Sequence, residues 1–167
     1  MRSDFTSEAL RTIGHDLDLR GLKTFSIRCD DDVFVVDAGY QSPPAAMPVT
    51  LHYCRNDIEQ LKRKAEERCD DLSIIANFTY LTETLSAIAT YIQDKAGHLV
   101  SISNKSAVIE TEYEAAQRGG RIIERLTDAD VYSLCIRGHK RRQKRQISND
   151  LRFTRFSSVA WTGRDCD

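Results

Sequence analysis

The feature that most constrains the fold is a pattern of five elements that occurs twice along the chain. In each copy a helix pattern is followed by three strand patterns and a second helix pattern, and equivalent elements lie 73 to 76 residues apart. Chance similarity would account for one shared element more easily than for five in the same order. We therefore predict an α+β protein of tandem duplicated α-β-β-β-α units, forming an antiparallel sheet with helices on one face.

An amphipathic helix pattern opens each unit. In SEALRTIGHDLDLRG the apolar residues Leu10, Ile13 and Leu17 recur at the spacing of one helix face, and the pattern stops at Gly21. The segment TETLSAIATYIQDKAG repeats this arrangement and stops at Gly97. Its apolar positions are Leu85, Ile88 and Ile92.

Three strand patterns follow each opening helix. FSIRC and VSISN alternate apolar and polar residues, as half-buried strands do, and each leads into a polar turn. We predict second strands in VFVVDAGY, from Val33, and in AVIETEY, from Ala107. Third strands begin the segments VTLHYCRND and RIIERLTDAD, which lead into the closing helices.

Each closing helix opens on a capping pattern. Asn56 with Glu59 in the first unit, and Thr127 with Asp130 in the second, would offer side-chain acceptors to free backbone N–H groups. A chain of 167 residues suits one compact domain, in which the two units are related by a pseudo-twofold axis. The predicted parts are a first repeat at 1–71, a connector at 72–80, a second repeat at 81–146 and a C-terminal tail at 147–167.

Composition is that of an ordinary soluble protein, with 41% apolar and 29% charged residues and no run long enough to span a membrane. The N-terminus MRSDFTSEAL has no apolar stretch after Arg2, so we expect no secretory signal, a cytoplasmic location and no membrane partner. The number of cysteines is odd and none are at metal-clamp spacing, which predicts reduced thiols and no metal site. They are Cys29, Cys54, Cys69, Cys135 and Cys166.

His52 and Cys54 are the first candidates for catalysis. They lie two residues apart in LHYC and would share a strand face, and a Cys–His pair can activate a thiolate. No third residue to orient the histidine is visible, so a structural role is the stronger interpretation. For a small enzyme with its site at the junction of the two repeats, His52, Tyr53 and Cys54 are the residues to substitute first.

Two short motifs are better explained as turns. Three consecutive carboxylates at Asp30–Asp32 could bind a divalent ion, but aspartate is also a favoured turn residue, which indicates a hairpin tip. QRGG at Gln117–Gly120 lacks the Lys-Ser/Thr of a phosphate loop and does not open a helix. We expect no cofactor.

The sheet face away from the helices is predicted to be polar. A sheet that binds nucleic acid usually presents basic and aromatic residues, whereas this face is neutral to acidic. This pattern argues against nucleic acid lying across the sheet and leaves the face free to pair with another protein subunit. Glu110, Glu112 and Glu124 also lie in strands, on faces that the pattern leaves open. The residues placed on this face are Thr24, Ser26, Thr50, His52, Ser101 and Ser103.

The segment RGHKRRQKRQ, from Arg137 to Gln146, has six Lys or Arg in ten residues. Between Arg137 and Phe156 there are eight basic residues and one acid, a charge of +7, so the rest of a chain of net charge −1 carries −8. One or two cations stabilise a helix C-terminus, by about 0.3–1 kcal/mol each, but six repel one another. The matching segment of the first unit, KRKAEERCDD, mixes both signs, so the fold does not require a basic end.

Beyond this segment, ISNDLRFTRFSSVAW interleaves Arg152 and Arg155 with Phe153 and Phe156. The alternation suits a packed or partly ordered tail, an added edge strand, or a single-stranded nucleic-acid platform. The candidate polyanion-binding residues are Lys140, Arg141, Arg142, Lys144, Arg145, Arg152 and Arg155.

The leading functional hypothesis is a non-enzymatic binding or assembly module, because no catalytic constellation is visible. Its partner would be a second copy of the chain or another protein. Binding of nucleic acid or another polyanion through the basic C-terminal segment is the first alternative. A small enzyme is the second, although we assign no catalytic residue.

Overall fold

The computed structural model describes residues 3–30, 33–40, 48–67, 81–104, 108–116 and 119–157. Within them the order α-β-β-β-α occurs twice, as predicted, and the α+β class is confirmed. The elements are α1 (Ser3–Leu19), β1 (Thr24–Asp30), β2 (Val33–Gly39), β3 (Val49–Tyr53), α2 (Arg55–Glu67), α3 (Leu81–Asp94), β4 (Gly97–Ser103), β5 (Ile109–Ala115), β6 (Gly120–Leu126) and α4 (Asp128–Ser157).

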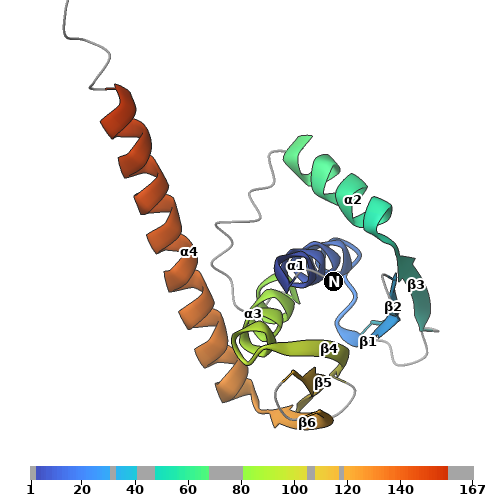
Figure 1. Ribbon diagram of the computed structural model, residues 1–167. Helices are drawn as coiled ribbons and strands as arrows, with labels where there is room; N and C mark the ends of the chain where they lie inside the picture. Colours follow the sequence, from blue (N-terminus) through green and yellow to red (C-terminus); the bar gives the residue numbers. More distant parts are fainter. Residues whose placement is uncertain are drawn as a thin grey trace, which may run out of the picture.

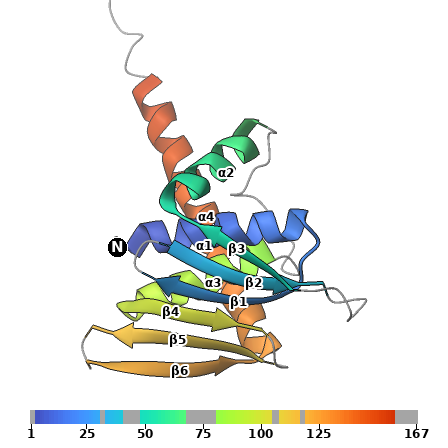
Figure 2. The same ribbon diagram turned by 90° about the vertical axis from the view of Figure 1, so that its right-hand side faces the viewer.

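The six strands form one antiparallel sheet in the order β3-β2-β1-β4-β5-β6. The first strands of the two units, β1 and β4, therefore meet in the middle (Figure 2). Ile27 lies opposite Ile102, with Ser26 opposite Ser103 and Arg28 opposite Ser101 on either side. Equivalent positions of β1 and β4 are 75 residues apart, so Ile27 pairs with its own equivalent, Ile102. The pairing is therefore symmetric about this pair of residues, as two copies of one unit would give. The duplication itself stays a prediction.

The helices lie on the same side of the sheet, with α1 and α3 packed side by side (Figures 1 and 2). The apolar residues predicted for the two opening helices are buried. They belong to one core with Phe25, Ile27, Phe34 and Ile102 of the sheet. The predicted core of the two opening helices is therefore confirmed.

The contact between α1 and α3 depends on Gly14 and Asp18. A side chain at Gly14 would place its Cβ 2.6 Å from the carbonyl oxygen of Leu81, so only glycine permits this approach. One turn later, the Asp18 carboxylate accepts hydrogen bonds from the backbone N–H groups of Leu81 (3.0 Å) and Thr82 (2.9 Å), and from the Thr82 hydroxyl (2.7 Å). The N-terminus of α3 is thus capped by a residue of α1.

The two opening helices end in a left-handed residue, but only one of these is the predicted glycine. Gly21 has φ of 70° and donates to the Asp18 carbonyl after α1, as in a Schellman motif. After α3 the left-handed residue is Ala96, with φ of 52°, while Gly97 already begins β4. Glycine is required at position 97 for a steric reason, because a Cβ there would lie 2.6 Å from the Tyr113 ring.

The two closing helices begin with similar caps. At α4 the predicted pair is confirmed: the Thr127 N–H donates to the Asp130 carboxylate (2.9 Å), and the Asp130 N–H donates back to the Thr127 hydroxyl (3.3 Å). At α2 the predicted Asn56–Glu59 cap is wrong, because the helix begins at Arg55 and places Asn56 inside its first turn.

The equivalent of Thr127 in the first unit is Cys54, which immediately follows β3. Its N–H donates to the Asp57 carboxylate (2.9 Å), and its carbonyl accepts from the N–H of Ile58. Asp57 and Asp130 therefore occupy the same capping position in the two units, and these hydrogen bonds lower the pKa of both. Both members of the predicted pair were therefore wrong, since the acid of this cap is Asp57 and its partner is the Cys54 N–H.

Candidate functional site

Helix α4 extends well past the rest of the molecule (Figure 1), and the basic segment, Arg137–Gln146, occupies its middle. We call the sheet together with α1, α2 and α3 the body. The helix continues beyond Gln146, the predicted end of the second repeat, to Ser157. An edge strand formed by Leu151–Phe156 is therefore excluded, and the Arg–Phe alternation does not produce the two faces of a strand. The predicted tail residues beyond Ser157 lie outside the described ranges.

The apolar residues of α4 form a stripe that packs against α3 rather than on the sheet. Val131, Leu134 and Cys135 are buried, and Leu134 and Gly138 line a shallow pocket of about 30 Å³ with Ala87, Tyr91 and other residues of α3. The reason is that α1 and α3 already cover the sheet. Helix α4 forms an outer layer and meets the sheet chiefly at β6, where it begins.

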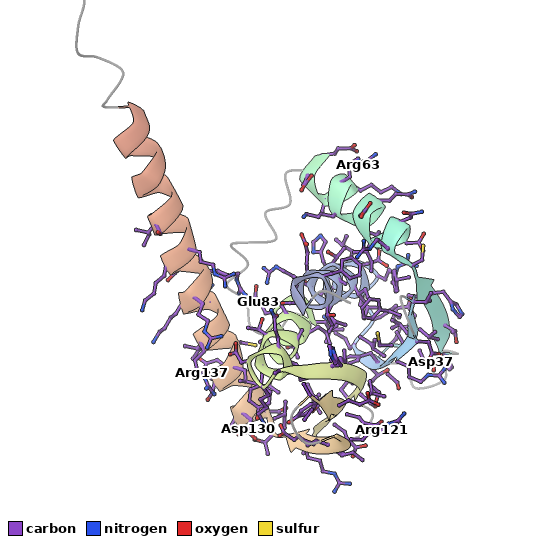
Figure 3. The ribbon with its side chains drawn as sticks, viewed as in Figure 1. Asp37, Arg63, Glu83, Arg121, Asp130 and Arg137 are labelled. Atoms are coloured by element: carbon purple, nitrogen blue, oxygen red, sulfur yellow. The ribbon has the colours of Figure 1, made fainter. Side chains whose placement is uncertain are left out.

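Two arginines of the basic segment tie α4 to α3, and the partner of one of them, Glu83, is labelled in Figure 3. Arg142 pairs with Glu83, whose side chain is 0% exposed and is also held by Arg11 of α1 at 2.9 Å. Arg141 pairs with Asp94 at 2.6 Å, at the surface. Both arginines were candidates for polyanion binding, and both contribute to the attachment of the helix.

The other basic side chains described on this segment face solvent. Lys140, Lys144 and Arg145 are exposed, and none forms an ion pair with a described residue. Arg137 is also exposed and donates to the carbonyl of Ser133 (3.4 Å). Arg152 and Arg155 fall on α4, but their side chains lie outside the described residues.

All but one of the basic positions of α4 share one side of the helix. They recur at steps of three, four and seven residues, which places them along one stripe at 3.6 residues per turn. We call this stripe the basic face. The exception is Arg142, whose side chain turns to Glu83. The basic face comprises Arg137, Lys140, Arg141, Lys144, Arg145, Arg152 and Arg155.

The open face of the sheet has a different electrostatic character. Arg121 of β6 lies within 3.3 Å of Glu112 and 3.5 Å of Glu114, and Arg125 lies within 3.2 Å of Glu110. The glutamates of β5 are therefore matched by the arginines of β6. The residues predicted for this face are exposed or half-buried, as expected: Thr24, Ser26, Thr50, His52, Ser101 and Ser103.

Glu124, whose face the pattern left open, points to the helix side of the sheet. Its carboxylate lies 2.5 Å from the Lys95 ammonium and accepts a hydrogen bond from the Tyr113 hydroxyl (2.8 Å). The Lys95 ammonium also lies 4.2 Å from the centre of the Tyr91 ring. Burial alone would raise the pKa of Glu124, but the hydrogen bonds from Lys95 and Tyr113 outweigh it and lower the pKa.

The three residues nominated for catalysis do not converge. His52 is exposed on the open face, whereas Tyr53 is buried on the helix side and donates to the Asp16 carboxylate (2.7 Å). Burial and this hydrogen bond raise the pKa of Tyr53. Cys54 lies beyond the strand, where its N–H serves the cap of α2. The three neighbours thus occupy three separate environments.

The two turn motifs fall at hairpins. Pairing of β1 with β2 runs to Asp30 opposite Val33, and pairing of β5 with β6 runs to Ala115 opposite Gly120. Residues 31–32 and 117–118 lie outside the described ranges. In the part of the chain that is described, no group of three or more His, Cys, Asp or Glu side chains could hold a metal ion.

Cys135 lies buried at the interface of α4 and α3. Its burial and the charge of Glu83 raise the pKa of the thiol to about 11. Cys29 and Cys54 are half-buried cysteines that take part in no disulfide. A buried thiol with a raised pKa is a poor nucleophile, so Cys135 has a packing role.

Comparisons with protein-family models, with curated proteins and with solved structures give no match. None of the helices in the described ranges combines the length and apolarity needed to cross a membrane.

Proposed function

We propose that the protein is a non-enzymatic binding module that contacts nucleic acid or another polyanion through the basic face of α4. The observation that carries the proposal is the exposure of Lys140, Lys144 and Arg145 on a helix that extends past the body. The cations of the open sheet face, in contrast, are matched by neighbouring carboxylates.

The fold alone does not account for these charges. Arg137 with Arg141, Lys140 with Lys144, and Arg141 with Arg145 are like-charged pairs four residues apart, and each such pair destabilises a helix by about 0.2–0.5 kcal/mol. Attachment of α4 uses Arg141 and Arg142. Phosphates lying along the basic face would relieve the repulsion and release their condensed counterions.

The test compares two charge-matched double variants. K144Q/R145Q removes one lysine and one arginine from the basic face. R63Q/K64Q removes the same pair from exposed positions of α2, the corresponding helix of the first unit (Arg63 is labelled in Figure 3). Binding of a fluorescein-labelled oligonucleotide is followed by anisotropy at about 0.1 M salt.

K144Q/R145Q is expected to weaken binding roughly tenfold or more, because each lost phosphate contact forfeits one counterion-release contribution. R63Q/K64Q should remain within about twofold of the unmodified protein, since its charges lie off the basic face. Equal losses in both variants would assign the effect to net charge rather than to α4. No binding by the unmodified protein would refute the proposal.

Assembly through the open sheet face is a second candidate, favoured by Ile123, which is 62% exposed on β6. Ile123 lies opposite Glu112 of β5, on the face away from the helices. Sedimentation equilibrium tests it: a dimer that Ile123→Glu dissociates would support assembly, and a strict monomer would refute self-assembly through this face.

A further inference from the structure

We propose that the basic face of α4 recognises a nucleic-acid duplex, along one sugar–phosphate backbone, rather than a single strand. This inference rests on the proposed function and names the class of ligand. It starts from the shape of the charge array. The basic face runs from Arg137 to Arg155 on one continuous helix, about 27 Å at 1.5 Å per residue.

The base of this array is fixed to the body. Arg142 pairs with the buried Glu83, Arg141 pairs with Asp94, and Leu134 and Cys135 are buried against α3. The direction in which the basic face leaves the body is therefore set before any ligand binds. A preorganised row of cations favours a ligand whose own charges are already in order, because neither partner must then be ordered on binding.

A duplex meets this requirement. Its phosphates are held in fixed positions on a stiff double helix, which bends little over the length of the basic face. A single strand is flexible, and laying it along a straight row of cations would cost conformational entropy. Proteins that bind single strands offset that cost by stacking bases on aromatic rings beside the cations.

Among the described residues, the basic face has no aromatic rings of this kind. Tyr132, the exposed aromatic ring described on α4, precedes the basic face by more than one turn. In the part of α4 whose side chains are described, no Phe, Tyr or Trp lies between Arg137 and Arg145, which favours contact with phosphates over stacking.

The cations also occupy one side of α4, not two. A helix seated in a major groove meets a backbone on each flank, whereas a one-sided array meets a single backbone. Contacts to phosphates carry no direct sequence information. We therefore expect affinities within about threefold among duplexes of different sequence, because each base contact that discriminates would contribute more than that.

The test uses the full chain and two labelled probes of equal length, a duplex and one of its strands, by fluorescence anisotropy. The duplex is expected to bind at least tenfold more tightly. A single strand that binds equally well or better would overturn the duplex assignment and leave the proposed function intact. No binding of either probe would refute the proposed function itself.

A pair of variants at Ser148 tests the role of a continuous helix without changing any charge. Ser148 is exposed on α4, beyond the ion pairs with α3. S148P interrupts the helix between Arg145 and Arg152, whereas S148A does not. S148P should lose at least fivefold in duplex affinity and little in single-strand affinity, and S148A should match the unmodified protein. Equal duplex binding by S148P and S148A would contradict the inference.

Discussion

Glu83 on α3 and Arg142 on α4 form an ion pair whose carboxylate is completely buried, and Arg11 on α1 completes the cluster. One acidic side chain thus connects three helices that are far apart in sequence. A buried charge is tolerated only when it is paired and hydrogen-bonded. The attachment of α4, and with it the direction of the basic face, depends on this cluster.

Replacing Glu83 by glutamine should lower the free energy of unfolding by about 3–5 kcal/mol, because both guanidinium groups lose their charged partner in a buried setting. Urea denaturation followed by circular dichroism measures the change. Glu67→Gln, an exposed position on α2, is the control and should stay within about 0.5 kcal/mol of the unmodified protein. Similar stabilities for the two variants would show that the cluster contributes little.

Gly14 and Gly138 both lie inside helices, yet alanine should have opposite effects at the two positions. At Gly14 the new Cβ would lie 2.6 Å from backbone atoms of α3, which predicts a loss of about 1–3 kcal/mol from overpacking. At Gly138 the nearest atom is the Arg142 guanidinium at 3.5 Å, so the higher helix propensity of alanine should add up to about 1 kcal/mol. Thermal unfolding measures both changes in stability. An unfolding temperature that is unchanged or higher in the Gly14→Ala variant would contradict the packing described for α1 and α3.

Cys135 should resist alkylation while the protein is folded. Its pKa of about 11 leaves little thiolate at pH 8, and its side chain is buried. Iodoacetamide labelling, read by peptide mass spectrometry, should therefore modify the half-buried Cys54 before Cys135. In denaturant, Cys54 and Cys135 should be labelled at similar rates. Rapid labelling of Cys135 in the folded protein would show that α4 does not stay packed on α3.

Glu124 should contribute to stability in a pH-dependent way. Its folded-state pKa lies below its ordinary value of 4.5, so its contribution is present above about pH 4.5 and is lost as the pH falls through the folded-state pKa. Glu124→Gln should be less stable by about 0.2–1 kcal/mol at neutral pH, and the difference should vanish in acid. A difference independent of pH would mean that the Lys95 and Tyr113 contacts do not depend on the charge of Glu124.

The order of elements and the core were predictable because they follow from local periodicity. Leu10, Ile13 and Leu17 reveal their helix face through spacing alone, and the alternation in FSIRC reveals a strand in the same way. The N-terminal cap of α2 was harder to predict from the sequence. The predicted pair was Asn56 with Glu59, whereas the structure pairs Asp57 with the backbone N–H of Cys54, a donor that no side-chain pattern reveals.

The contacts that position the site were beyond sequence reasoning because they join distant segments. Asp18 caps α3 at Thr82, 64 residues away, and Glu83 meets Arg142 across 59 residues. In the sequence, Glu83 resembles any acid in the first turn of a helix. The basic segment itself was visible from charge, but its division into anchoring and exposed cations required the position of α3.

The most direct test of the central claim is the salt dependence of polyanion binding. The logarithm of the association constant for a labelled duplex is plotted against the logarithm of salt concentration, for the unmodified protein and for K144Q/R145Q. If both side chains neutralise phosphates, the unmodified protein gives a steep negative slope, and the variant's slope is shallower by about 1.8, or about 0.9 for each lost contact. Identical slopes, or binding indifferent to salt, would contradict a polyanion site on the basic face of α4.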